Sequence, residues 1–130
     1  MEYHVVDPDE LDASSDHPCD RRSVTEALDL TTLAAAVYEL APGEQLPRTY
    51  HYHDQREELF YVIDGTLAAE TPGGEFAVRA GELFVVEPAS PHRPHNPDDA
   101  GRSVRVLGVG APRFDVGKPF DPAADPPDGA

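Results

Sequence analysis

Apolar residues in the second half of the chain occur in short runs separated by turn residues. Residues 59–63 (Leu-Phe-Tyr-Val-Ile) are rich in aromatic and aliphatic side chains, residues 75–79 alternate polar and apolar side chains, and residues 83–86 are apolar throughout. A last run spans residues 103–110. Short runs at this regular spacing predict strands of an antiparallel barrel or double-sheet sandwich. The pattern therefore predicts an all-β fold.

The residues between these runs predict where the chain turns. Asp64-Gly65 is the dipeptide best suited to a two-residue type I′ hairpin, so we expect residues 66–70 to return along residues 59–63. Thr71-Pro72-Gly73-Gly74 predicts a second turn, and Ala80-Gly81 predicts a third.

Two segments before residue 42 carry weaker signals. Residues 23–28 match one helical turn, with Ser23 as its cap and Glu26 at the capping-box position. Residues 33–40 are Ala-rich, which favours helix, but their short length and the following Pro42-Gly43 suit a strand that ends in a turn. Both interpretations of residues 33–40 stay open.

The two ends of the chain have the composition of irregular arms. Residues 7–22 are polar and acidic, and Pro8 and Pro18 interrupt any regular element. Residues 121–130 have too few apolar side chains to bury a core, which predicts a disordered tail. Since 130 residues make about one domain, we expect a single domain over residues 1–120.

The chain is strongly acidic. It has 25 Asp and Glu residues against 10 basic residues, of which only Lys118 is a lysine, and its net charge is -15. Such a charge repels phosphate backbones and anionic bilayers, so we expect neither a nucleic acid nor a membrane as a partner. An acidic excess spread along the whole chain is typical of proteins from halophilic, salt-adapted organisms, although an ordinary acidic bacterial protein is the alternative.

Two further features bear on the compartment. Cys19 is the only cysteine, so no intramolecular disulfide can form. Residues 1–7 have neither the basic start nor the apolar segment of a signal peptide, and no apolar run is long enough to span a bilayer as a helix. We therefore expect a cytoplasmic protein.

Four of the six histidines lie between positions 51 and 95. Residues two apart in a strand point the same way, so the imidazoles of His51 and His53 can reach one metal ion. Glu58 opens the next apolar run, and His92 stands eleven residues after Gly81. One carboxylate and three neutral imidazoles are a typical set of ligands for a divalent transition metal.

The spacing of these residues resembles that of the cupin superfamily. The first cupin motif, G-x5-H-x-H-x3,4-E-x6-G, is matched at four positions: His51, His53, Glu58 and Gly65. Its leading glycine corresponds to Gly43, which precedes His51 by seven residues instead of five.

The second cupin motif, G-x5-P-x-G-x2-H-x3-N, is matched in spacing by Gly81, His92 and Asn96. Its proline and second glycine are replaced by Glu87 and Ala89, which affects the expected turn more than the expected ligand. Together the two motifs cover residues 43–96, which form the core of the resemblance.

The resemblance implies a small single-domain cupin, whose fold is a double-stranded β-helix, or jelly-roll barrel. It further implies one divalent transition metal ion (Fe, Mn, Ni, Co, Zn or Cu) held by His51, His53, Glu58 and His92. We expect a metal-dependent enzyme of dioxygenase or isomerase type acting on a small metabolite, with unknown catalytic residues. A non-catalytic cupin that binds a small ligand as a sensor or carrier is the alternative. Resemblance to cupins also implies a homodimer, to which residues 2–6 could contribute.

Residues beside these four need separate interpretations. Glu57 is a rival of Glu58, but only Glu58 fits the step to Gly65, so we expect Glu57 to face solvent. His95 follows His92 by three residues, which on a strand places it on the opposite face, so we expect a surface histidine. His17 and Cys19 form an isolated H-x-C pair, which is more often incidental than ligating.

Other neighbours of the predicted ligands could shape a pocket. Phe60 and Val62 share the strand face of Glu58 and could line the pocket or pack in the core. Arg48 and Arg93 could hold a substrate carboxylate, but in so acidic a chain we favour pairing with nearby Asp or Glu. Three tyrosines could supply a phenol as an acid or simply pack between strands: Tyr50, Tyr52 and Tyr61.

Overall fold

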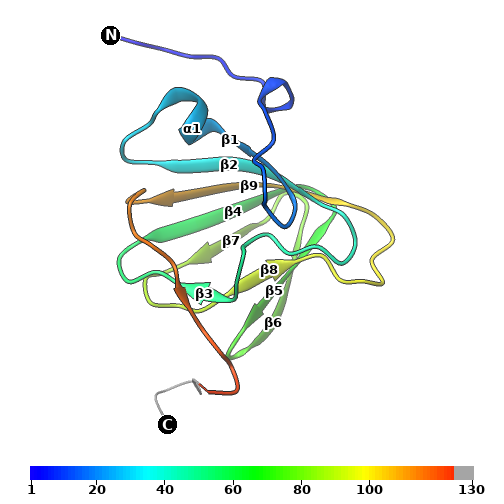
Figure 1. The fold of residues 1–130 in the computed structure, drawn as a ribbon. Helices are drawn as coiled ribbons and strands as arrows, with labels where there is room; N and C mark the ends of the chain where they lie inside the picture. The colour runs from blue at the N-terminus through cyan, green and yellow to red at the C-terminus, as the bar shows by residue number, and fades with distance from the viewer. Residues whose placement is uncertain (125–130) are drawn as a thin grey trace.

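The computed structural model describes residues 1–124, and most of its regular elements are β-strands (Figure 1). A five-stranded antiparallel sheet has the spatial order β1 (Asp20–Ser23), β2 (Ala34–Leu40), β9 (Val104–Ala111), β4 (Glu57–Asp64) and β7 (Leu83–Val86). A three-stranded sheet consists of β6 (Gly74–Arg79), β5 (Thr66–Thr71) and β8 (Arg93–His95). The all-β double-sheet architecture predicted from the sequence is confirmed.

Short elements complete the fold. Strands β3 (His51–Tyr52) and β10 (Lys118–Pro119) pair with each other, and the chain between β9 and β10 runs down from the large sheet toward the smaller strands (Figure 1). The helical elements are a 3₁₀ turn, η1 (Pro8–Glu10), and one short α-helix, α1 (Val24–Leu28). Within residues 1–124, neither helix has the length and apolar character needed to cross a bilayer.

The core lies between the two sheets and consists of residues that alternate along the strands. On β9 every second residue is buried, because the sheet pleat turns Val104 and Val106 inward. On β4 the same alternation buries Phe60 and Val62. The other buried core residues are Cys19, Leu40, Leu46, Leu67, Val78 and Val86.

The hairpin predicted at Asp64-Gly65 is wrong. Strand β4 pairs with β7 and β9, whereas β5 pairs with β6 and β8, so the chain leaves one sheet for the other at this point. Only Gly65 has a positive φ, +83°, whereas a type I′ turn needs two such residues. A Cβ on Gly65 would lie 2.7 Å from the carbonyl oxygen of Ser103. The glycine is required for a corner against another backbone segment.

The turn predicted at residues 71–74 is confirmed as the β5–β6 hairpin, in which Thr71 pairs with Gly74. Residues 34–40 form strand β2, because β1 and β9 supply hydrogen-bonding partners on both of its sides. The predicted cap of α1 is also confirmed, since Ser23 Oγ accepts a hydrogen bond from the Glu26 N–H at 3.0 Å.

The N-terminal arm is more ordered than predicted. Residues 20–23 form β1 at the edge of the large sheet instead of an irregular segment, because backbone pairing with β2 compensates for their polar side chains. Of the predicted C-terminal tail, residues 121–124 form a turn, in which the Ala124 N–H donates to the Asp121 carbonyl at 3.1 Å. Residues 125–130 lie outside the described part of the chain.

The turn before His92 lacks the second glycine of the second motif. Ala89 takes that position with a left-handed φ of +63°, and its N–H donates to the His53 carbonyl at 2.6 Å. A left-handed conformation costs an L-residue with a side chain about 1–2 kcal/mol.

Substituting Ala89→Gly should therefore raise the free energy of unfolding by about 0.5–1 kcal/mol, because relief of backbone strain exceeds the added entropy of the unfolded chain. Urea denaturation would measure the change. Ala80→Gly is the matched control: Ala80 also lies in a turn but has no positive φ, and its substitution should lower stability. A less stable Ala89→Gly variant would contradict the prediction.

Candidate metal centre

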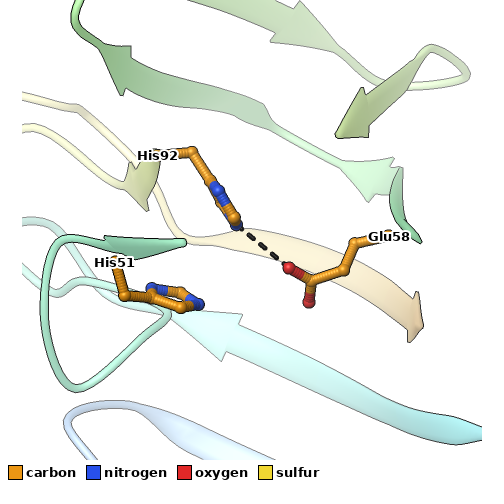
Figure 2. A group of neighbouring side chains, drawn as sticks. All are labelled: His51, Glu58 and His92. Atoms are coloured by element: carbon orange, nitrogen blue, oxygen red, sulfur yellow. Dashed lines mark ion pairs between the residues drawn. The ribbon is translucent and has the colours of Figure 1, made fainter. Parts of the chain in front are cut away.

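Three segments bring the predicted ligands together. His51 lies on β3, Glu58 lies on the inward face of β4, and His92 precedes β8. The backbones of His51 and His92 are bridged by reciprocal hydrogen bonds of 3.3 and 2.9 Å. One ligand atom from each of His51, Glu58 and His92 lies within 4.8 Å of the other two. Figure 2 shows the three side chains converging from different elements.

His53 lies beside this group. Its Nε2 is 3.7 Å from Glu58 Oε1, and its ring meets that of His51 edge-on with the centroids 5.0 Å apart. It is not part of the group in which all ligand atoms lie within 4.8 Å of one another. The structure thus gathers His51, Glu58 and His92 most closely and places His53 next to Glu58.

Backbone carbonyls set the protonation of all three imidazoles. The Nδ1–H groups donate to carbonyl oxygens: His51 to Thr49 at 2.9 Å, His92 to Ser90 at 2.8 Å, and His53 to Asp115 at 2.5 Å. Because a carbonyl can only accept, Nδ1 carries the proton and Nε2 of the neutral ring keeps its lone pair. Orientation of histidine by a partner on the other nitrogen is the usual arrangement around protein-bound metals.

Two atoms at the centre lack partners among the described residues. Glu58 Oε1 and His92 Nε2 are buried without a hydrogen bond, although they lie only 3.2 Å apart. With Nδ1 protonated, both atoms are acceptors, and burying acceptors unpaired is unfavourable. A cation between them would satisfy both. The residues present therefore fit a metal ion and could hold one.

Electrostatics at the centre favour the protonation states that ligands need. Burial alone would raise the pKa of Glu58, but the neighbouring imidazoles, His92 before His53 and His51, lower it, because each of these rings, once protonated, favours the carboxylate. Burial, followed by the neighbouring His92, lowers the pKa of His51. At neutral pH the site therefore presents a carboxylate and a neutral His51 imidazole, which are the forms that bind metal.

A cavity of about 570 Å³ opens onto these residues, and all four predicted ligands line it. Phe60, Tyr38 and Phe114 contribute aromatic surface to its lining. Of the two roles left open by the sequence, Phe60 has both, since it lines the pocket and packs in the core, whereas Val62 packs in the core alone. Four arginines also line the cavity: Arg21, Arg48, Arg56 and Arg113.

Sequence reasoning missed most of this lining. Tyr38, Arg21, Arg113 and Phe114 come from β1, β2 and the segment after β9, far in sequence from both motifs. No local pattern distinguishes these residues from ordinary strand and loop residues. Only the pairing of β1 with β2, and of β2 with β9, brings them to the cavity.

The prediction that His95 is a surface residue is wrong. Its side chain is only 14% exposed, and its Nε2 lies 3.6 Å from Glu75 Oε2. Strand parity itself holds, because buried His92, Pro94 and Asn96 alternate with half-buried Arg93 and His95, but the opposite face is not open to solvent at His95. Strand β5 on one side and a bridge to Gln45 on the other cover the residue.

The structure also tests the predictions for other residues near the ligands. Glu57 is exposed, as predicted. Arg93 Nη2 donates to Glu70 at 2.8 Å, which confirms that it neutralises a nearby acid. Cys19 is buried in the core, where burial raises the pKa of its thiol to about 12. The ring Nε2 of His17 hydrogen-bonds the carbonyl of Leu46 at 2.7 Å.

Comparison with known proteins agrees with this geometry. Residues 36–109 match the sequence profile of the cupin domain family. The tetracenomycin polyketide synthase protein TcmJ from Streptomyces glaucescens is 35% identical over 95 residues, which are 68% of this chain. The match spans 62% of the length of TcmJ.

Solved structures share the fold at low sequence identity. A sugar phosphate isomerase of the cupin superfamily from Silicibacter pomeroyi superposes with a TM-score of 0.76 at 20% identity, covering 91% of this chain and 82% of the other. The polyketide cyclase RemF from Streptomyces resistomycificus superposes with a TM-score of 0.75 at 19% identity, covering 92% of this chain and 87% of RemF. At such identities the similarity shows the fold alone.

Proposed function

Because this chain belongs to the cupin domain family, we propose that it is a metal-dependent enzyme that closes a ring in a polyketide intermediate. The observation that carries the proposal is the pair of buried, unpartnered acceptors, Glu58 Oε1 and His92 Nε2, in the lining of a cavity. The residues that would hold the metal are His51, His53, Glu58 and His92. A divalent cation bound there would supply a Lewis acid that polarises a carbonyl oxygen.

One relative in sequence and one in fold support the choice of substrate. TcmJ is by name a polyketide synthase protein, and RemF, which has the same fold, is a polyketide cyclase. A cavity of about 570 Å³ is within the range of small-molecule sites, about 300–1,000 Å³. Its aromatic lining suits a flat, partly aromatic substrate.

Tyr38 is our candidate for a proton donor. Burial is the main cause that raises the pKa of its phenol, so the group stays protonated at neutral pH. Ring closure joins an enol carbon to a ketone carbonyl, and the carbonyl oxygen then leaves as water after it has taken up protons. A phenol in the cavity lining can supply one of them.

Metal-loaded protein is incubated with a poly-β-ketone in the absence of oxygen. We expect a cyclised product that has lost water, which mass spectrometry detects. Tyr38→Phe should lower the rate about 100-fold, because general acid catalysis contributes about 10²–10⁴-fold, and should leave the metal content unchanged. Tyr61→Phe is the matched control, since Tyr61 lies on β4 but outside the cavity lining.

Three results would contradict the proposed ring closure and indicate another function. A product that has gained oxygen, with oxygen consumed, would indicate a dioxygenase. Binding of the poly-β-ketone without any product would indicate the non-catalytic sensor or carrier. Turnover of a sugar phosphate instead of the polyketide would indicate an isomerase.

Two expectations from the sequence stay predictions. A homodimer involving residues 2–6 is compatible with the exposure of most of this segment, and sedimentation would test it. A salt-adapted source predicts a protein whose stability rises with salt concentration, because screening weakens the repulsion among its acidic groups.

A further inference from the structure

The cavity is lined by four arginines against three carboxylates, Glu26, Glu58 and Asp115, although the chain as a whole has a net charge of -15. Four of its nine arginines line the cavity: Arg21, Arg48, Arg56 and Arg113. They come from β1, from the loop before β3, from the residue before β4 and from the segment after β9. Four separate segments thus contribute a cation to the same cavity.

Four of the five arginines outside the cavity lining are neutralised by close carboxylates. Four guanidinium groups donate to a carboxylate at 2.7–2.9 Å: Arg22 to Asp20, Arg93 to Glu70, Arg102 to Asp64 and Arg105 to Asp9. These pairs are what an acidic protein is expected to form with its few cations.

The cavity arginines have different partners. Arg48 donates to the Asp16 carbonyl, and Arg113 donates to the Leu30 carbonyl at 2.6 Å. Arg113 also lies 3.8 Å from Asp29, and Arg21 donates to Ser14 Oγ at 2.9 Å and to Glu26 at 3.4 Å. A carbonyl orients a guanidinium without cancelling its charge, so the positive charges of Arg48 and Arg113 stay available to a ligand.

Arg56 has a separate role. Its guanidinium donates to the carbonyls of Pro112 and Arg113 and lies 3.9 Å from Glu58 Oε2. These contacts tie it to the protein next to a predicted ligand. The remaining three, Arg21, Arg48 and Arg113, form what we term the arginine rim.

The arginine rim is accessible and partly pre-organised. Arg48 is exposed, and the side chains of Arg21 and Arg113 are 24% and 23% exposed. The Arg113 guanidinium also lies over the Phe114 ring, 4.7 Å from its centroid, which places a cation beside aromatic surface. A planar guanidinium held in this way matches the geometry of a carboxylate.

We propose that the arginine rim binds a carboxylate of the substrate while the aromatic part of the substrate contacts Phe60 and Phe114. The identity of the substrate as an aromatic polyketide acid rests on the proposed function. The preference for an anionic aromatic ligand follows from the charge and partners of the rim and does not depend on metal.

Binding of 2-naphthoate to metal-free protein tests this inference. The protein is treated with chelator, dialysed and held at pH 8, where imidazoles are uncharged, so that neither metal nor histidine can attract the anion. Because the chain has no tryptophan, naphthyl fluorescence reports binding directly. We expect 2-naphthoate to bind about tenfold more tightly than its neutral amide, 2-naphthamide. The affinity for 2-naphthoate should fall as salt is added.

Substitutions in the arginine rim test whether these arginines cause the preference for the anion. Arg48→Gln and Arg113→Gln should each lower the affinity for 2-naphthoate about three- to tenfold. Each should change the affinity for 2-naphthamide less than twofold. Arg102→Gln is the matched control, because Arg102 pairs with Asp64 outside the cavity lining, and it should change neither affinity. Since Arg48 is exposed, its substitution should leave folding intact, which a thermal melt checks.

Three outcomes would overturn the inference. The first is equal affinity for 2-naphthoate and 2-naphthamide, and the second is an equal loss of affinity in Arg102→Gln. The third is tighter binding of 2-naphthyl phosphate than of 2-naphthoate, which would assign the rim to a phosphate. Because the measurement uses metal-free protein and no turnover, failure of the proposed function would leave its result unaffected.

Discussion

Replacing His92 with alanine should abolish stoichiometric binding of a transition metal. His92 is 1% exposed, its Nδ1–H is held by the Ser90 carbonyl, and its Nε2 lies 3.2 Å from Glu58 Oε1. Among the described residues, only His51, Glu58 and His92 have ligand atoms that all lie within 4.8 Å of one another. Loss of an orienting partner alone typically weakens metal binding by about 10–100-fold, so loss of the ligand itself should cost at least about 100-fold.

Elemental analysis of untagged protein, purified in high salt without chelators, would measure the metal content. We expect about one equivalent in the unmodified protein and less than a tenth of that in His92→Ala and His51→Ala. His95→Ala is a suitable control, since His95 is also shielded from solvent but lies outside the group of ligand atoms. Unmodified protein that contains no metal and takes up no added Mn, Fe, Ni or Zn would refute the metal centre.

His53 distinguishes a four-ligand centre from a three-ligand one. Its Nε2 is 3.7 Å from Glu58 Oε1, so a small shift would bring it to an ion held by the other three residues. A loss of metal in His53→Ala as complete as in His92→Ala would support four ligands. Retention of most of the metal would support three, with His53 positioned beside them.

Substituting Gly65→Ala should lower the free energy of unfolding by about 3 kcal/mol. The residue has a φ of +83°, which alone costs a non-glycine residue about 1–2 kcal/mol. In addition, the new Cβ would lie 2.7 Å from the Ser103 carbonyl oxygen and 3.1 Å from the Val104 Cα. Both are backbone atoms that cannot rotate away, and overpacking of this kind costs a further ~1–3 kcal/mol.

Gly81→Ala isolates the contribution of the close approach. Gly81 has a nearly equal φ of +88°, but a Cβ placed there has no neighbour within 4 Å. We expect its substitution to cost only the strain, about 1 kcal/mol, in urea denaturation followed by circular dichroism. If the two variants were equally stable, the corner at Gly65 would not be as tightly packed as the structure describes.

Part of the fold followed from local patterns. Strands β4 and β7 and the β5–β6 hairpin were predictable because alternation of side chains and turn glycines act within a few residues. Edge strand β1 was not predictable, since its polar residues 20–23 gain their order from pairing with β2. The sheet to which β5 belongs was also missed, because the Asp64-Gly65 dipeptide specifies a bend and not the partner of the returning strand.

The candidate site also has features that were predictable from the sequence and features that were not. Its predicted ligands His51, His53, Glu58 and His92 could be named from the chain alone, since each motif places its residue types at short, fixed spacings. Tertiary structure alone decided the carbonyl partners of the imidazoles, the burial of His95 and the arrival of Arg21 and Arg113 at the cavity. Local sequence encodes which face a side chain takes, whereas what covers that face depends on pairings between segments far apart in the chain.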